Sequence, residues 1–141
     1  MQRQIKIARF LIAVVLGWNL QCAIVFLVNP RGYVGAFGLA GMAGVQMVRA
    51  LGLLFVMWNV PYVFALVNPV RNKTSLIEAV AMQAIGLAGE TLILLLGGSY
   101  PALVEKTIMR FIFFDAVGLM LLLAALWLVW DHKWERIRTA R

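Results

Sequence analysis

Four long runs of apolar residues, separated by short polar or glycine-rich segments, divide the chain. Each run has close to the 20 or so residues that a helix needs to cross the hydrocarbon core of a bilayer. Proline or paired glycines, at which helices end, follow the first three runs. The pattern therefore predicts a single all-α membrane domain, residues 1–141, folded as an integral membrane four-helix bundle. The expected helices are at about residues 10–28, 51–67, 79–96 and 111–130.

The composition supports a membrane rather than a water-soluble fold. The chain is 63% hydrophobic and 13% charged, against roughly 45–50% and 25% in soluble domains.

The first run follows Arg3, Lys6 and Arg9, as the apolar core of a signal peptide would. It is longer than the usual 7–15 residues or so, and no small-x-small cleavage site follows it. We therefore expect it to be a retained membrane helix.

The net charge of +7 is divided unevenly between the two sides of the predicted bundle. Nine lysines and arginines lie on the side of the two termini, and four lie on the other side. Because basic loops stay in the cytoplasm, a multi-pass protein with both termini cytoplasmic is expected, with a basic cytoplasmic tail at 131–141. These basic residues adjoin membrane helices, so membrane lipids, and no nucleic acid, are the expected partners.

The first connection on the outer side, at about residues 29–48, carries a glycine at every third position from Gly32 to Gly44. An apolar, glycine-rich stretch beside the bilayer is compatible with a short interfacial or re-entrant segment that packs over the helix ends. A flexible loop whose glycine spacing is chance is the alternative. Both interpretations stay open at this point.

Two Trp-Asn pairs recur in the first two apolar runs. Trp18-Asn19 precedes one Asn-Pro pair and Trp58-Asn59 precedes another, at nearly the same spacing. Inverted repeats are known in transporters, but a single helix is a small unit for a duplication. Shared chemistry for ending a helix accounts for the recurrence.

Polar residues stand beside glycines at helical spacing within all four runs. Such stripes are typical of faces that turn toward other helices, because glycine permits close approach and polar groups avoid lipid. The four stripes are Val14, Gly17, Gln21 and Ile24; Arg49, Gly52, Val56 and Asn59; Gln83, Gly86, Glu90 and Leu94; and Phe111, Asp115, Gly118 and Leu122.

These stripes predict an intramembrane polar pocket in the outer half of the bundle. A charge at the bilayer centre costs at least ~2.5–3.5 kcal/mol, so Glu90 is expected to be protonated or paired, with Arg49 reaching toward it or toward Asp115. The candidate lining residues are Gln21, Arg49, Asn59, Glu90 and Asp115. A purely structural role is the alternative, since intramembrane amides often only link helices and a Glu90–Arg49 pair can serve stability alone.

The chain holds one cysteine and one histidine. It therefore lacks the ligands for bis-histidine haem or a Cys/His zinc site, and the thiols for an internal disulfide or a dithiol mechanism. The methionines are scattered, as packing residues are. We predict no catalytic residue, no metal and no cofactor, and an enzyme is the function class that the residues support least.

The segment from the second helix to Glu90 resembles a family of small, uncharacterised bacterial four-helix membrane proteins. The likeness is carried by LFVMWNVPY at 54–62, PVR at 69–71, SLIEA at 75–79 and MQAIGLAGE at 82–90. In size and layout the chain is also similar to DoxX-like proteins, some of which are associated with quinol-oxidising complexes. These resemblances imply a bacterial plasma (inner) membrane protein of four helices and transfer no catalytic residue.

Two function classes are consistent with this layout. The short loops favour a non-enzymatic membrane protein that acts as an accessory subunit or as a small lipophile-binding bundle. The alternative is a small oligomeric proton-coupled transporter in which Glu90 titrates; four helices enclose little volume, so its path would lie at a dimer interface. A homo-oligomer or a larger membrane complex is the expected assembly.

Overall fold

The computed structural model describes residues 2–130, and these contain helices and turns but no strand. The elements are α1 (Gln2–Val28), the 3-10 turns η1 (Pro30–Gly32) and η2 (Gly35–Phe37), α2 (Gly41–Trp58), α3 (Val60–Val67), α4 (Lys73–Leu96) and α5 (Ala102–Val129). The all-α prediction is confirmed for this part of the chain. The predicted basic tail at 131–141 lies outside the described residues.

Four helical segments are long and apolar enough to cross a membrane: Gln2–Val28, Gly41–Val67, Lys73–Leu96 and Ala102–Val129. Many of their apolar side chains point away from the protein, with Leu96 80% exposed, Trp127 79% and Val28 78%. So much exposed apolar surface fits lipid far better than water. The predicted number of apolar helices is confirmed.

Every helix begins earlier than the apolar pattern predicts. The second begins at Gly41 instead of Leu51, so the glycine-rich connection covers about 29–40 and not 29–48. The glycines of α2 serve close packing: a Cβ on Gly44 would lie 2.8 Å from a Val34 methyl, and one on Gly52 would lie 3.0 Å from the Ala23 carbonyl oxygen. The other helices extend into the charged segments that precede their apolar runs, because backbone hydrogen bonds of the helix continue beyond the part that lies in the hydrocarbon core.

The second membrane segment is broken into α2 and α3 at Asn59. Pro61 follows two residues later and has no N–H to donate to the preceding turn, which is the usual cause of such a break. The Asn59 side chain donates from Nδ2 to the Phe55 carbonyl oxygen at 2.6 Å, and the Asn59 backbone N–H donates to the same oxygen. After the break, α3 packs against α4.

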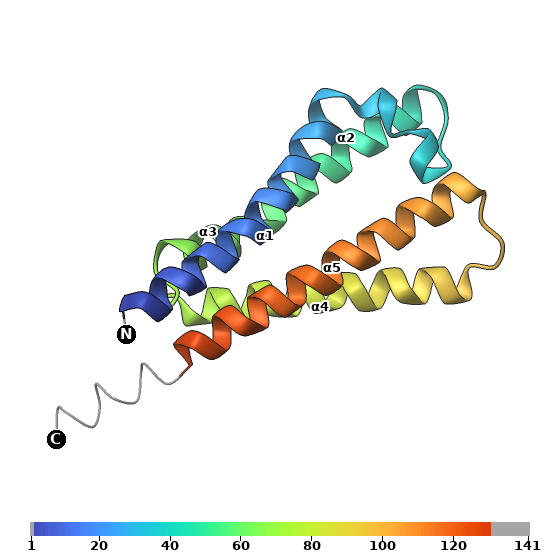
Figure 1. The fold of residues 1–141 in the computed structure, drawn as a ribbon. Coiled ribbons are helices and arrows are strands. Elements are labelled where there is room, and N and C mark those ends of the chain that lie inside the picture. Colours follow the sequence, from blue (N-terminus) through green and yellow to red (C-terminus); the bar gives the residue numbers. More distant parts are fainter. Residues whose placement is uncertain (1, 131–141) are drawn as a thin grey trace, which may run out of the picture.

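The helices form two pairs that diverge from one end of the molecule, as Figure 1 shows. α1 packs along α2, α4 packs along α5, and α1 with α5 joins the pairs. α3 packs on α4 and α1 where the pairs converge. We call this the closed end, and we call the end with the η1–η2 connection and the start of α5 the open end.

The hydrophobic core lies at the closed end. Small residues from four helices are completely buried there, which lets the helix backbones approach closely. Larger side chains fill the space between them. The cluster consists of Ala8, Ile12, Val15, Leu16, Tyr62, Ala65, Leu76, Ala79, Leu122, Ala125 and Val129.

Basic side chains fasten the same end from outside. Arg9 donates from Nε to the Leu66 carbonyl oxygen at 2.9 Å and ties α1 to α3. The Lys73 ammonium donates to the Trp130 carbonyl oxygen and lies 5.2 Å from the centroid of that indole ring, which ties α4 to α5. Hydrogen bonds to carbonyl oxygens and cation–π contact therefore fix the convergence of the two pairs.

The η1–η2 connection crosses the open end and contacts the start of α5. Phe37 of η2 stacks on Phe111 with ring centroids 6.2 Å apart. Gly38 ends η2 with φ +66°, a left-handed conformation that favours glycine. The glycine-rich segment therefore packs over the helix ends and bridges the two pairs.

Candidate functional site

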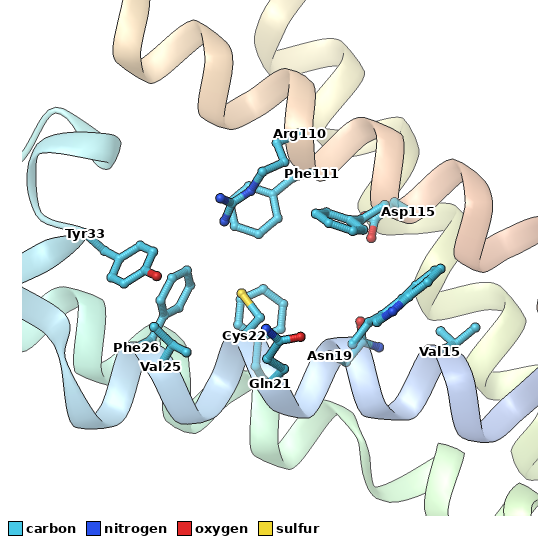
Figure 2. Close-up of a pocket in the computed structure, with 13 residues that line it drawn as sticks. Val15, Asn19, Gln21, Cys22, Val25, Phe26, Tyr33, Arg110, Phe111 and Asp115 are labelled. Atoms are coloured by element: carbon cyan, nitrogen blue, oxygen red, sulfur yellow. The ribbon is translucent and has the colours of Figure 1, made fainter.

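The diverging helix pairs enclose a first cavity of about 230 Å³, shown in Figure 2. α1 and α5 supply opposite walls, and single residues of α2 and the η1–η2 connection complete the lining. The lining residues are Val15, Trp18, Asn19, Gln21, Cys22, Val25, Phe26, Tyr33, Phe55, Arg110, Phe111, Phe114 and Asp115.

Aromatic rings form much of the wall of this first cavity. Phe26 packs edge-on against Tyr33 with ring centroids 5.1 Å apart, and Phe55 stacks on Phe111 at 6.4 Å. Trp18 and Phe114 make a further contact at 5.9 Å. Because ring pairs of this kind hold each other in place, the cavity has fixed, flat, apolar walls.

The polar groups of the first cavity lie at two levels along α5. The Arg110 guanidinium is 5.9 Å from the centroid of the Phe111 ring, within range of a cation–π interaction. Asp115 lies five positions further along the helix, or about 7.5 Å along its axis. Asn19 of α1 lines the cavity near Asp115 (Figure 2). The cavity therefore offers a cation at one level and a carboxyl with an amide at another.

A second cavity, of about 210 Å³, lies between α2 and α4. It shares Asn19, Phe55 and Asp115 with the first cavity. Its lining residues are Asn19, Leu51, Leu54, Phe55, Trp58, Met82, Gln83, Gly86, Glu90 and Asp115. The Oε2 atom of Glu90 is buried and has no hydrogen-bond partner among the described residues.

A buried hydrogen-bond chain joins these cavities to the closed end. The fully buried Tyr62 donates its hydroxyl to Gln83 Oε1 at 2.7 Å, with the Ala79 carbonyl oxygen at 3.2 Å. Gln83 in turn donates from Nε2 to Asp115 Oδ1 at 2.7 Å. This chain links α3, α4 and α5 and fixes the orientation of the Asp115 carboxyl.

Two glycines make room for the chain in a reciprocal way. A Cβ on Gly86 of α4 would collide with the carboxylate of Asp115, and a Cβ on Gly118 of α5 would lie 2.8 Å from Gln83 Nε2. In each helix the polar residue stands three positions before its glycine. Because α4 and α5 run antiparallel, each polar side chain meets the glycine of the other helix.

The structure brings three of the five predicted site residues to the cavities. Gln21 and Asp115 line the first cavity, and Glu90 and Asp115 line the second. Asn59 is buried at the break between α2 and α3 but lines neither cavity; its Oδ1 has no partner among the described residues. Arg49 is exposed and lines neither cavity, so the expected approach of Arg49 to Glu90 or Asp115 is not seen.

The inward faces of α4 and α5 agree with the predicted stripes, and that of α1 does not. Gln21 and Ile24 are exposed, whereas Val15 and Phe26 are buried and Cys22 lines the first cavity. The inward face of α1 is thus rotated from the expected one, because α1 contacts α2 and α5 together. In α2, Gly52 is buried as expected, while Arg49 and Val56 are exposed.

Several residues at the cavities were not among the predicted site residues. Trp18, Asn19 and Trp58 line the cavities. All three belong to the recurring Trp-Asn pairs, so that pattern was a signal that could have found them. Gln83 stood on a predicted stripe without being assigned to the pocket. Arg110 is one of the four basic residues counted on the outer side of the predicted bundle. No pattern in the sequence indicated that it lines a cavity.

The described residues contain no group of three or more His, Cys, Asp or Glu side chains that could hold a metal ion. The side chains that line the two cavities include aromatic rings, amides, one guanidinium and two carboxyls. In searches against family models, curated proteins and solved structures, nothing matched this chain.

Proposed function

We propose that this protein is a non-enzymatic, polytopic inner-membrane protein that binds a small lipophile in the first cavity, either alone or as an accessory subunit of a larger membrane complex. The observation that supports this most directly is the set of aromatic walls around Arg110 and Asp115 between the two helix pairs. Ligand sites in proteins have this character: mostly apolar walls with a few placed polar groups.

The lining favours a flat molecule about one or two rings in size. Phe26, Phe55 and Phe111 offer ring faces and edges for stacking. Arg110 is a hydrogen-bond donor for a carbonyl or acidic oxygen, and Asp115 is an acceptor for a hydroxyl or amine. The proposed ligand class is therefore a small aromatic lipophile that carries hydrogen-bonding groups at its ends.

The proposed orientation puts both termini in the cytoplasm of a bacterial cell, with the cavities in the outer half of the membrane. The asymmetry of nine basic residues against four supports it, as does the resemblance to small bacterial four-helix proteins. Fusion of a fluorescent protein and of alkaline phosphatase to the C-terminus tests it. The fluorescent fusion is expected to be bright and the phosphatase fusion inactive, and the reverse would overturn the orientation.

Binding can be measured with 1-aminonaphthalene, a flat two-ring fluorescent amine whose emission rises in apolar cavities. In phosphatidylcholine nanodiscs, the wild-type protein is expected to give saturable emission above that of empty discs. Cys22→Phe places a ring in the cavity and is expected to weaken binding at least about tenfold, because the volume is taken. Ile24→Phe is the matched control, since Ile24 is 56% exposed on the same helix and lines neither cavity.

Equal binding by wild type, Cys22→Phe and Ile24→Phe would remove the first cavity as the binding site. Purification in mild detergent shows whether the protein is a monomer, a homo-oligomer or part of a larger complex. A larger complex that co-purifies supports the accessory-subunit form of the proposal, and a homo-oligomer or monomer that binds the probe supports the stand-alone form.

A second candidate function is a small oligomeric proton-coupled transporter that uses Glu90. The observation that favours it is the buried Oε2 of Glu90, a residue of the second cavity, which has no hydrogen-bond partner within residues 2–130. Ionisable residues inside membranes commonly mark ion pathways. Proton flux into proteoliposomes tests it. Glu90→Gln is expected to abolish the coupled flux, whereas flux that is unchanged by this substitution excludes the role.

A further inference from the structure

The second cavity differs from the first in the charges that line it. Two carboxyls, Glu90 and Asp115, belong to its wall, and among the residues that the structure describes no lysine, arginine or histidine lines it. The first cavity, in contrast, has Arg110 beside the shared Asp115. The second cavity therefore disfavours anions and provides negative charge for a cation.

Glu90 has the free acceptor in this cavity. Asp115 already accepts the Gln83 amide through Oδ1, whereas the buried Oε2 of Glu90 has no hydrogen-bond partner among the described residues. An ionised carboxyl inside a membrane needs a partner. Because the lining supplies no cation, a bound molecule is the natural source of one.

Aromatic and apolar side chains lie next to the carboxyls. Trp58 and Phe55 line the cavity together with Leu51, Leu54 and Met82. An indole ring is the best partner for a cation among the aromatic side chains, and quaternary ammonium groups are recognised in this way. The apolar residues provide the surface for the remainder of such a molecule.

The cavity is also reachable from the lipid. α2 and α4, which form its two sides, are not among the closely packed helix pairs. Leu54 is 53% exposed and Trp58 is 39% exposed, although both line the cavity. A molecule dissolved in the bilayer can therefore reach the carboxyls without crossing the aqueous loops.

We propose that the second cavity is a binding site for a small lipophilic cation, of the aryl- or alkylammonium class, with its ammonium group between Glu90 and Asp115 and its apolar part against Trp58 and Phe55. This site shares Asn19, Phe55 and Asp115 with that of the proposed lipophile and differs from it by Glu90 and Trp58. The proposal holds whether or not Glu90 also couples to protons.

Equilibrium dialysis of radiolabelled benzyltrimethylammonium against the full-length protein in phosphatidylcholine nanodiscs tests the site. Saturable binding above empty discs is expected for the wild type. Glu90→Gln keeps the shape of the side chain and removes its charge, so binding is expected to weaken at least about tenfold. Glu105→Gln is the matched control, because Glu105 is exposed and outside both cavities.

A neutral ligand separates charge from shape. Neopentylbenzene has a carbon in place of the ammonium nitrogen, and it is expected not to displace benzyltrimethylammonium from the wild-type protein. Effective displacement at equal concentration, or Glu90→Gln binding as tightly as wild type, would overturn the proposal. The neutral-ligand comparison needs no variant, so it decides the question even where Glu90→Gln does not fold.

The aromatic contribution has its own matched pair. Trp58→Leu is expected to weaken cation binding several-fold through loss of the cation–π contact, while Trp127→Leu, at a 79% exposed position outside both cavities, leaves binding unchanged. Equal effects of the two substitutions would remove Trp58 from the site.

Cys22→Phe, which fills the first cavity, separates this proposal from the lipophile proposal: cation binding persists in that variant when the sites are distinct.

Discussion

The closed and open ends of the bundle use opposite kinds of side chain at the helix contacts. At the closed end, four completely buried alanines, Ala8, Ala65, Ala79 and Ala125, bring the helices together. At the open end, Phe26, Phe37, Phe55 and Phe111 contact one another between the diverging pairs. In lipid, where the hydrophobic effect does not drive helices together, side-chain size decides how closely they pack. The difference shows how one chain can pack its helices tightly at one end and leave cavities between them at the other.

The largest expected effect comes from emptying the closed end. Leu122 is completely buried in the core cluster, so Leu122→Ala is expected to lower the free energy of unfolding by about 2–5 kcal/mol. Leu123→Ala is the control, at a neighbouring position that is 47% exposed, and is expected to cost under about 1 kcal/mol. Titration of the unfolding equilibrium with sodium dodecyl sulfate in mixed micelles measures both. Equal losses would show that the core cluster is not the stabilising part of the bundle.

An added ring separates the two ends more directly. Ala125→Phe forces a large side chain into a filled region and is expected to cost at least about 1–3 kcal/mol of stability. Cys22→Phe adds a similar ring at the open end, where the first cavity has room for it, and stability is expected to change by under about 1 kcal/mol. The same detergent titration serves. A larger loss for Cys22→Phe than for Ala125→Phe would contradict the assignment of packed and open ends.

The hydrogen-bond chain at the junction of the two ends has a smaller effect. Tyr62→Phe removes the donor to Gln83 and is expected to cost about 0.6–1.7 kcal/mol, the range of such bonds inside membranes. Tyr100→Phe removes a hydroxyl bonded to the Ile93 carbonyl oxygen in an exposed connection, with little expected loss. A double-mutant cycle of Tyr62→Phe with Gln83→Leu measures the coupling, and additive losses would mean that the two side chains do not interact.

The number of helices and the sides of α4 and α5 that face inward could be read from the sequence. Apolar runs of membrane length leave few alternatives, and the spacing of Gln83 to Gly86 and of Asp115 to Gly118 indicated the contact faces. The faces of α1 and α2 could not be read fully, because Gln21 and Arg49 are polar residues that the fold leaves exposed at a diverging end. Their polarity predicted that they would be buried between helices. They are exposed because the two helix pairs diverge at this end.

The cavities depend on distances that no single stretch of sequence contains. Arg110 and Cys22 line the same cavity from helices that are far apart in the chain. Arg110 is one of the four basic residues on the outer side of the predicted bundle and Cys22 is the single cysteine, and neither belongs to a predicted stripe. The break at Asn59 was not predicted either. Pro61 indicated it, but the run from 51 to 67 has membrane length and contains no charged residue, so it was predicted as one helix.

Asn19, Phe55 and Asp115 belong to the walls of both cavities. A molecule in one cavity that turns any of these side chains changes the shape or charge of the other cavity at the same moment. Thermodynamic linkage then requires that the second molecule alter the affinity for the first by the same factor. The shared wall would therefore couple the two proposed sites, so that a molecule bound in either cavity would change the affinity of the other cavity by the same factor.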